Sequence, residues 1–182
     1  MAETLYGPVA DAVIDRASKV KLLICDVDGV FSDGRIYLGN DGEELKAFHT
    51  RDGFGIKAIQ HAGIQVAVIT GRSSAIVNRR MTALGVAHIH QGCEDKIAAY
   101  EHLRQTLELL PEQCAYIGDD LVDLAVMKQV GLAVAVEDAH PALLPHAHYR
   151  TRIRGGFGAV RELCDLLLQS QGKLDQAKGM SV

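Results

Sequence analysis

Short apolar runs recur along this chain at a regular pitch, and they restrict its fold more than any other feature. Each has the length of a strand that is buried on both faces of a parallel sheet. The runs are KLLIC (21–25), QVAVIT (65–70), VAHIH (86–90), CAYIG (114–118) and LAVAV (132–136). Segments with helical patterns separate them, at residues 53–62, 74–84, 95–109 and 121–129. This alternation predicts βαβ units and an α/β fold, with a doubly wound, Rossmann-like parallel sheet flanked by helices.

The chain has the size and composition of one globular domain. Its 182 residues, of which 48% are hydrophobic, suffice for a single substantial core. No linker or repeat divides the sequence, so residues 1–182 are expected to form one domain. Two further helices are predicted, at residues 4–18 and 158–170. The tail from about residue 172 to residue 182 is expected to be flexible.

Residues 31–50 interrupt the alternation of strands and helices. They contain turn signals at 32–34 (SDG) and 40–42 (NDG), and the strand-like runs RIYL and ELKAF flank the second turn. The pattern predicts a small β-hairpin inserted between the first strand and the first core helix. Because an isolated two-stranded hairpin is only marginally stable in water, we expect it to pair with the hairpins of other copies of the chain.

Charge and cysteine usage argue against several classes of partner. The formal net charge of −4 gives no basic surface field that would attract nucleic acid. No apolar run approaches the roughly 18 residues of a membrane span, and no secretory leader is visible. The four cysteines are scattered without a CxxC pair, which favours a reducing compartment over disulfides or zinc, and Cys25 is expected to be a core thiol. A soluble, cytoplasmic protein without nucleic-acid or membrane partners is therefore expected.

Polar side chains gather where the predicted strands end. Ligands of open α/β sheets bind outside the carboxyl ends of the strands. The residues there are Asp26 and Asp28 after the first strand, Thr70, Gly71 and Arg72 after the second, Lys96 after the third, and Asp119, Asp120 and Asp123 after the fourth. So many carboxylates would repel one another without a hard cation among them. Mg²⁺, which takes few protein ligands and several waters, fits this set.

Three other motif interpretations fail. An EF-hand loop beginning at Asp26 needs Asp or Asn at its fifth position and Gly at its sixth, where Val30 and Phe31 stand. The glycines of GGFG (155–158) lie near the carboxyl end and lack the sixth-position glycine of a dinucleotide-binding loop. A receiver domain places its Thr and Lys late, whereas the order here is Asp, Thr, Lys, Asp-Asp. A single DxD is often a solvated turn, but such residues at four successive strand ends indicate one catalytic site.

The motifs together resemble those of a known enzyme superfamily. DVDGV (26–30), VITGR (68–72), Lys96 and GDDLVD (118–123) resemble the motifs of the haloacid dehalogenase superfamily of phosphatases. Three longer stretches are similar to the 3-deoxy-D-manno-octulosonate 8-phosphate (KDO 8-phosphate) phosphatases: LKAFHTRDGFGIK (45–57), TGRSSAIVNRR (70–80) and GGFGAVRELCDLLL (155–168). The resemblance covers about residues 18 to 172. It implies a domain without a large cap, in a tetramer whose neighbouring subunit covers the active site.

The resemblance also implies a covalent aspartyl-phosphate mechanism. Asp26 would be the nucleophile, and Asp28 would protonate the leaving sugar oxygen and later activate water. Mg²⁺ would be bound by Asp26, the backbone carbonyl of Asp28 and Asp119. Asp123 would support the metal site from outside or orient Lys96. The phosphate contacts would come from Thr70, the Gly71 backbone and Lys96.

Substrate recognition is assigned by the same resemblance. A 2-keto acid needs a partner for its carboxylate, and arginine provides two parallel hydrogen bonds. We expect Arg72 and Arg80 in this role, and Arg79 as a solvated helix charge. The other residues expected to bind substrate are His49, Thr50, Arg51, Asp52, Gly53, Lys57 and Asp120. His88 and His90 are expected to be strand or surface residues and not metal ligands.

The expected function is that of a cytoplasmic, Mg²⁺-dependent phosphatase acting on KDO 8-phosphate in lipopolysaccharide precursor synthesis, as a homo-oligomer with shared active sites. One alternative is a phosphatase for a related nine-carbon keto-sugar acid 9-phosphate, with the same catalytic residues. An alternative of another class is a non-catalytic sugar-phosphate-binding partner of a sugar-nucleotide synthetase. A binding protein would not need both a nucleophile and an acid, so Asp26 and Asp28 argue against it.

Overall fold

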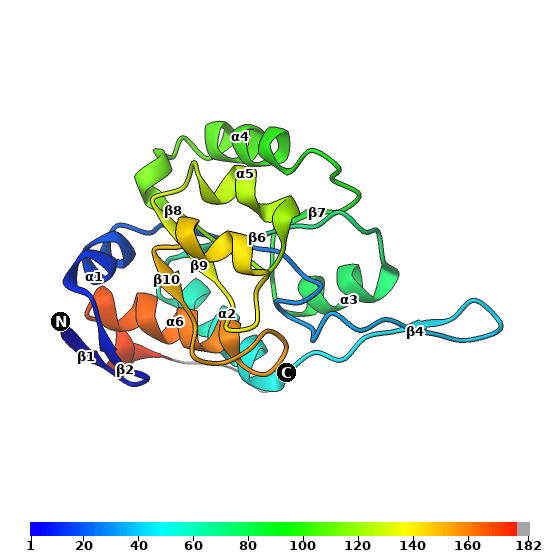
Figure 1. Cartoon of the computed structure of the whole chain (residues 1–182), viewed down its shortest axis with the longest axis horizontal. Coiled ribbons are helices and arrows are strands. Elements are labelled where there is room, and N and C mark those ends of the chain that lie inside the picture. The colour runs from blue at the N-terminus through cyan, green and yellow to red at the C-terminus, as the bar shows by residue number, and fades with distance from the viewer. Residues whose placement is uncertain (178–182) are drawn as a thin grey trace.

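The computed structural model describes residues 1–177, and its centre is a six-stranded parallel sheet (Figure 1). The strand order is β10-β9-β8-β3-β6-β7. The strands are β3 (Leu22–Cys25), β6 (Gln65–Ile69), β7 (His88–His90), β8 (Cys114–Gly118), β9 (Leu132–Ala135) and β10 (Tyr149–Arg150). Central β3 pairs with β6 on one side and β8 on the other, and all its residues are buried. The predicted doubly wound α/β fold is confirmed, and every apolar run forms a strand.

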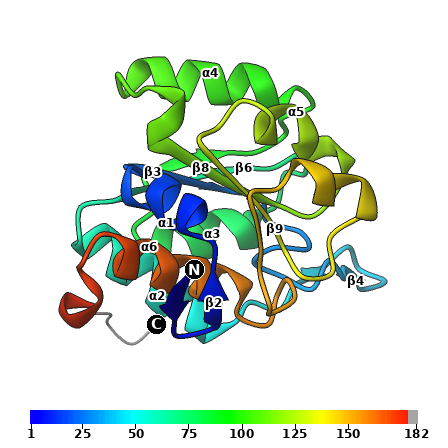
Figure 2. The ribbon, with the colours of Figure 1, turned by 60° about the vertical axis from the view of Figure 1, so that its left-hand side comes forward.

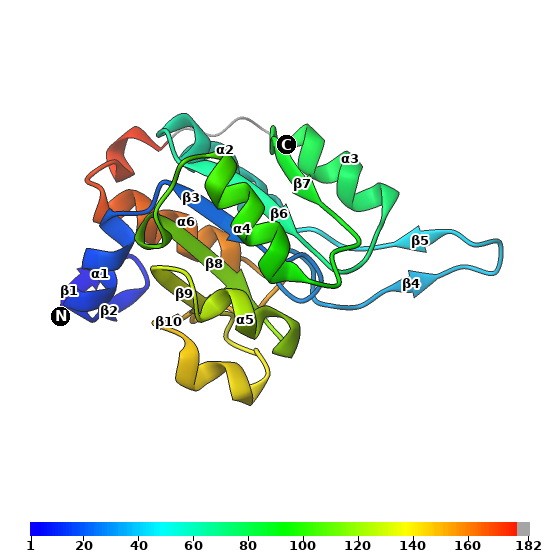
Figure 3. The same ribbon diagram turned by 90° about the horizontal axis from the view of Figure 1, so that it is seen from above.

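Helices cover both faces of the sheet. The helices are α1 (Asp11–Ser18), α2 (Thr50–His61), α3 (Ala75–Ala83), α4 (Lys96–Thr106), α5 (Leu124–Met127) and α6 (Ala159–Ser170). Helices α4 and α5 lie on one face, while α1, α2, α3 and α6 lie on the other (Figures 1 and 3). The predicted helix over 121–129 is shorter, because a 3₁₀ turn over Leu121–Asp123 precedes α5. The two-residue edge strand β10 was not predicted, since it has no apolar run.

The predicted helix over residues 4–18 is wrong in its first half. A separate hairpin forms there from β1 (Ala2–Thr4) and β2 (Gly7–Val9), and α1 begins only at Asp11. Gly7 adopts a φ of 101°, and Pro8 lacks the N–H that a helix would use. The hydroxyl of Tyr6 donates to Asp165 at 2.8 Å, so this hairpin is anchored on α6.

The predicted hairpin insertion is present, and no large cap accompanies it among residues 1–177. Its strands are β4 (Tyr37–Leu38) and β5 (Glu44–Leu45), shorter than the apolar runs suggested. The ribbon projects away from the rest of the molecule (Figures 1 and 3). Tyr37, Leu38 and Leu45 are exposed by 53%, 74% and 62%. The apolar side chains of this protruding hairpin are therefore largely uncovered by the part of the chain that the structure describes.

The predicted flexible tail begins with packed residues. A short 3₁₀ turn forms over Leu174–Gln176, and the Lys173 ammonium donates to the Ala62 carbonyl at 2.9 Å, so the first residues after 172 are packed. Residues 178–182, the rest of that prediction, lie outside the described residues. Among residues 1–177, none of the helices has the length and apolar character that a membrane crossing requires.

Helices α2 and α6 lie side by side below the sheet, and a buried carboxyl joins them (Figure 2). Asp52, in the first turn of α2, is 1% exposed, and its Oδ1 accepts a hydrogen bond from the Arg161 N–H at 2.9 Å. Its Oδ2 has no partner among residues 1–177. Burial raises the pKa of Asp52 to about 7, although the Arg161 N–H and the charges of Arg80 and Arg161 act in the opposite direction.

Because the pKa of Asp52 is raised in the folded state, the stability of the protein should depend on pH. Between its unfolded pKa of 3.8 and its folded pKa of about 7, the folded state binds more protons than the unfolded state. The free energy of unfolding therefore falls as pH rises through this window. Asp52→Asn has no carboxyl to titrate, so its free energy of unfolding should not show this fall. The difference in free energy of unfolding, variant minus wild type, should therefore rise by up to about 4 kcal/mol between pH 4 and pH 8.

Denaturant unfolding at several pH values measures this difference. Asp41→Asn, at the exposed tip of the β4–β5 hairpin, is the control and should follow the wild-type profile. A constant difference between Asp52→Asn and the wild type across the pH range would contradict the assignment.

Candidate active site

A cavity of about 320 Å³ opens at the carboxyl ends of the parallel strands. Its lining consists of Asp26, Asp28, Gly34, Thr70, Gly71, Arg72, Lys96, Asp119, Asp120 and Val122. The strand ends thus bring together the residues that the sequence pattern placed there. A larger hollow of about 490 Å³ lies at the opposite end of the sheet, beside Lys19 and Glu112. It has no comparable cluster of buried charges, so the chemistry identifies the cavity at the carboxyl ends as the candidate site.

Asp26 and Asp28 follow β3 directly, and the backbone around them is tightly held. The Asp26 N–H donates to the Ile117 carbonyl of β8 at 3.1 Å, and Asp26 Oδ1 accepts from the Val27 N–H at 2.8 Å. Gly29 has a φ of 85°, and a Cβ there would overlap the carboxylate of Asp119. The glycine after the second aspartate is therefore required, because the side chain of Asp119 fills the space beside it.

Lys96 lies between two carboxylates at the start of α4. Its ammonium is 3.0 Å from Asp26 Oδ1 and 2.8 Å from Asp123 Oδ1. Burial opposes the positive charge, but the two aspartates outweigh this effect and raise the pKa of Lys96. The pKa of Asp26 is also raised, by burial and by the charge of Asp123, with Lys96 acting against both. A charged lysine is thus fixed beside the predicted nucleophile.

Asp123 is fully buried and fully hydrogen-bonded. Its Oδ1 accepts from Lys96 and from the Tyr116 hydroxyl at 2.5 Å, and its Oδ2 accepts from the N–H groups of Asp119 and Asp120 at 2.9 and 3.2 Å. These bonds fix the chain that carries Asp119. The geometry thus favours Asp123 as a residue that orients Lys96 and the 119–120 backbone, which is one of the two roles expected for it.

The acidic cluster fits a divalent cation. Asp26, Asp119 and Asp123 each offer a carboxylate oxygen, and these oxygens lie within 4.8 Å of one another. Burial and the neighbouring charges of Asp26 and Asp123 raise the pKa of Asp119, which indicates negative charge that the protein alone does not compensate. Because both oxygens of Asp123 already accept hydrogen bonds, Asp26 and Asp119 are the available side-chain ligands. An all-oxygen set of this kind suits Mg²⁺.

The structure separates the predicted substrate-binding residues into two groups. Asp28, Thr70, Gly71, Arg72, Lys96 and Asp120 line the cavity. His49, Thr50, Arg51, Gly53, Lys57 and Arg80 lie on α2, its cap and α3, outside that lining, and their substrate contacts stay predictions.

Asp52, which is also predicted to bind substrate, is absent from the cavity lining as well. Its buried carboxyl accepts a hydrogen bond from the start of α6, and Arg80 lies near this carboxyl, so its substrate contact also stays a prediction. His49 has a structural contact of its own, since its Nδ1 caps α2 by accepting from the Arg51 N–H at 3.1 Å.

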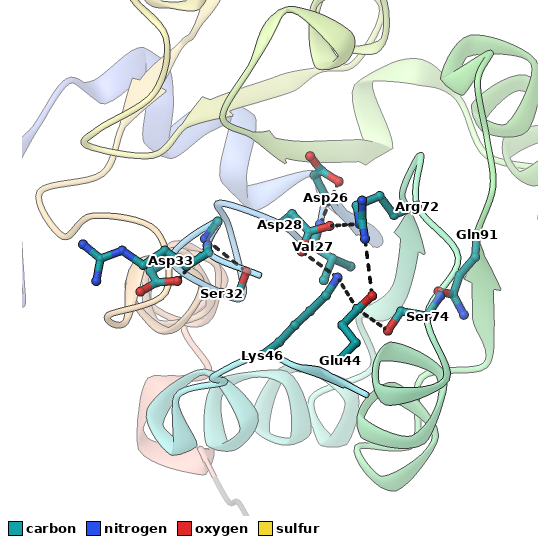
Figure 4. A network of polar contacts seen from close by, with 12 residues as sticks. Asp26, Val27, Asp28, Ser32, Asp33, Glu44, Lys46, Arg72, Ser74 and Gln91 are labelled. Carbon is teal, nitrogen blue, oxygen red and sulfur yellow. Dashed lines mark hydrogen bonds and ion pairs between the residues drawn. The ribbon is translucent and has the colours of Figure 1, made fainter. Parts of the chain in front are cut away.

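Two charged residues at the site were missed by the sequence analysis. Lys46, just after β5, donates to Asp28 Oδ1 at 2.8 Å, and Glu44 contacts Arg72 and accepts from the Ser74 hydroxyl at 3.0 Å (Figure 4). Glu44 and Lys46 are two residues apart, so in an extended strand they share one face. The alternation in ELK could have indicated a polar face turned toward the cavity.

The glycines of GGFG have a structural purpose. A Cβ at Gly155 would overlap the Gly29 carbonyl, and the Gly156 N–H donates to the Val30 carbonyl at 2.9 Å. The buried carboxylate of Glu162 holds the preceding loop by accepting from Tyr149 and from two backbone N–H groups. This loop therefore supports the segment that carries Asp28.

Comparison with known proteins decides the family. A sequence model described as haloacid dehalogenase-like hydrolase matches residues 85–154. The KDO 8-phosphate phosphatase of Yersinia pestis is 61% identical over 180 residues, which is 99% of this chain and 96% of that protein. The chain belongs to this family of haloacid dehalogenase-like hydrolases. It is therefore a phosphoric monoester hydrolase, and the resemblance seen in the sequence is confirmed.

Solved structures of family members superpose closely on this one. The Y. pestis phosphatase has a TM-score of 0.98 at 60% identity, with 100% of this chain and 98% of that chain covered. The Moraxella catarrhalis phosphatase has a TM-score of 0.90 at 42% identity, with 92% of this chain and 97% of that chain covered. That crystal structure contains a magnesium ion, a phosphate ion and a KDO molecule.

The close approach at Gly155 yields a prediction. Gly155→Ala should lower the free energy of unfolding by about 1–3 kcal/mol, because the new methyl group must displace the Gly29 carbonyl. Phosphatase activity should fall as well, since that displacement moves the Asp28 segment. Thermal unfolding and steady-state kinetics measure the two effects.

Gly63→Ala provides the control for this substitution. Gly63 has a φ of 93°, but a methyl group at this position would meet no atom within 4 Å. The change should therefore cost about 1 kcal/mol of backbone strain and leave the activity intact. Full activity in Gly155→Ala would contradict the supporting role of the glycine loop.

Proposed function

We propose that this protein hydrolyses KDO 8-phosphate to KDO and inorganic phosphate with Mg²⁺ as its cofactor. The observation that carries the proposal is the convergence of Asp26, Asp28, Lys96 and Asp119 in one cavity at the carboxyl ends of the sheet. Relatives that are 61% and 57% identical to this chain are named for that activity, and the Moraxella catarrhalis phosphatase, at 42% identity, has a crystal structure in complex with magnesium, phosphate and KDO.

Phosphoryl transfer begins at Asp26. Its Oδ1 is held by the Val27 N–H and Lys96, so its Oδ2 is the oxygen free to attack phosphorus. The bond from phosphorus to the sugar oxygen breaks as the bond from phosphorus to Asp26 forms, and Asp28 gives its proton to the leaving oxygen. Water then attacks the acyl phosphate and loses a proton to Asp28. Phosphate leaves, and both aspartates return to their starting states.

The charges around the phosphoryl group support this route. Bound Mg²⁺ would be held by Asp26 and Asp119 and would neutralise charge on the phosphoryl oxygens in the transition state. Lys96 adds a fixed positive charge beside Asp26. Thr70 and Gly71, at the end of β6, face the same cavity and provide hydrogen-bond donors for phosphate oxygens.

Arg72 is the first candidate for binding the carboxylate of the keto acid. Its side chain lines the cavity and is half exposed, so a substrate can reach the guanidinium. Its contact with Glu44 at 3.3 Å shows that the guanidinium is placed where it can pair with a carboxylate. Arg80 is the weaker of the two arginine assignments, because it lies near the buried Asp52. The exposed Arg51 at the start of α2 and the half-buried Lys57 further along this helix are proposed to contact the sugar from a neighbouring subunit.

A phosphate-release assay tests the proposed substrate. With Mg²⁺, KDO 8-phosphate should be hydrolysed with a higher kcat/KM than a nine-carbon keto-sugar acid 9-phosphate, and a chelator should abolish turnover until Mg²⁺ is restored. Asp26→Asn should have no measurable turnover, because its amide cannot attack phosphorus. Equal or inverted substrate preference would overturn the assignment to KDO 8-phosphate. Absence of turnover on any sugar phosphate would instead favour a non-catalytic binding protein.

We also propose that the chain forms a tetramer in which the β4–β5 hairpin of one copy covers the cavity of another. The exposed Tyr37, Leu38 and Leu45 need a partner surface, and the exposed Leu121 and Val122 provide an apolar rim at the cavity. Burial of these side chains would stabilise the hairpin. The assembly would work in the cytoplasm, where its product enters the synthesis of lipopolysaccharide precursors.

A charged residue on the hairpin should disrupt this assembly. Leu38→Asp places an unpaired carboxylate in the proposed interface, so sedimentation should detect smaller species and the phosphatase activity should fall. Leu5→Asp is the matched control, since Leu5 is 64% exposed in the distant β1–β2 turn. A tetramer with full activity in Leu38→Asp would rule out the proposed interface.

A further inference from the structure

Lys46 has an unusual position for a lysine on a protruding hairpin. It follows β5 on the arm that returns to the body of the protein, and the exposed fraction of its side chain is 0%. Its ammonium donates to Asp28 Oδ1 at 2.8 Å and lies 3.5 Å from Glu44 Oε1. A buried ammonium is costly unless carboxylates compensate it, so these two contacts fix the side chain in place.

Four side chains form a ring of alternating charge at this point (Figure 4). Lys46 contacts Asp28 and Glu44, and Arg72 closes the ring, with its Nη2 at 3.3 Å from Glu44 and its Nε at 3.9 Å from Asp28 Oδ2. The two oxygens of Asp28 therefore face two different cations. The hydrogen bond from Lys46 holds Oδ1, and the longer Arg72 contact places a second positive charge near Oδ2.

Asp28 depends on this ring more than Asp26 does. The Asp26 carboxylate accepts a hydrogen bond from its own backbone neighbour, Val27, whereas Asp28 lies in the loop beyond β3. Within residues 1–177, the hydrogen bond to the Asp28 side chain comes from Lys46. Lys46 itself is absent from the cavity lining and does not reach a substrate there.

We propose that Lys46 is a positioning residue that orients the Asp28 carboxyl for proton transfer to the leaving oxygen. This inference rests on the proposed function, in which Asp28 is the acid. The hairpin then has a task in its own subunit, because its return arm delivers the group that aligns the acid. A displacement of about 1 Å in a catalytic group can cost about 100-fold in rate, so loss of this contact should be visible in kinetics.

Substrates with different leaving groups can show whether Lys46 positions the acid or only supports the fold. A sugar alkoxide needs a proton as it leaves, whereas p-nitrophenolate is stable without one. The ratio kcat/KM reports the steps up to the phosphorylation of Asp26. Misalignment of Asp28 should therefore lower kcat/KM for a sugar phosphate and leave that for p-nitrophenyl phosphate nearly unchanged. Damage to the fold or to the phosphate contacts would lower both.

The test compares Lys46→Met with the wild-type enzyme on both substrates, with Mg²⁺ present. We expect kcat/KM for KDO 8-phosphate to fall by about 10- to 100-fold and that for p-nitrophenyl phosphate to change by less than about twofold. Lys46→Arg, which keeps the charge, should recover part of the lost rate. Lys19→Met is the control with the same change of charge, since Lys19 lies at the opposite end of the sheet, and it should match the wild type.

Two results would overturn the inference: an equal loss on both substrates, or no loss on either. If Lys46→Met does not fold, Lys46→Gln, which keeps hydrogen-bond donors without the charge, is measured in the same way. Failure of the proposed substrate would be seen separately, as wild-type enzyme that does not hydrolyse KDO 8-phosphate. The comparison of leaving groups is then made with a hexose 6-phosphate that the wild type accepts, and the same two results decide it.

Discussion

The ammonium of Lys96 lies between the carboxylates of Asp26 and Asp123, and this buried contact joins three segments of the chain. Asp26 directly follows β3, Lys96 begins α4, and Asp123 lies in the turn after β8, where it also accepts a hydrogen bond from Tyr116 of β8. Breaking such a contact leaves an uncompensated charge in the interior, which typically costs about 3–5 kcal/mol. The positive charge of Lys96 offsets part of the repulsion among the carboxylates, so the cavity can hold several of them close together, as a cation site needs.

Around that contact, glycines allow segments distant in sequence to pack closely. Gly29 makes room for the Asp119 side chain, and Gly155 makes room for the Gly29 carbonyl, so three such segments lie against one another. Glu162 secures the last of them from inside α6. Catalysis by phosphoryl transfer depends mainly on alignment and fixed charge, and such close backbone packing provides the alignment.

The sequence predicts the sheet and its active edge well, because both depend on local pattern. Apolar runs of strand length define β3, β6, β8 and β9, and the rule that carboxyl ends share one edge brings Asp26 to Lys96. What it misses depends on tertiary contact. The edge strand β10 forms where residues 149–150 pair with β9, and the β1–β2 hairpin is held by α6 through Tyr6.

The roles of side chains that lie behind the cavity lining are harder still to predict. Asp52 stands in a stretch that resembles a substrate-binding segment, yet it turns inward to α6, since its direction is set by helix packing. Lys46 stands in a hairpin whose composition suggests exposure, yet its ammonium is buried because Asp28 and Glu44 are close in space.

The order of the active-site residues along the chain has a consequence during synthesis. Asp26, Asp28, Lys46 and Thr70 are made before Lys96 and Asp119, so a nascent chain that ends before Lys96 has the proposed nucleophile without the neighbouring positive charge and without one of the two proposed cation ligands. A chain that ends before Lys96 would therefore lack the phosphatase activity proposed above.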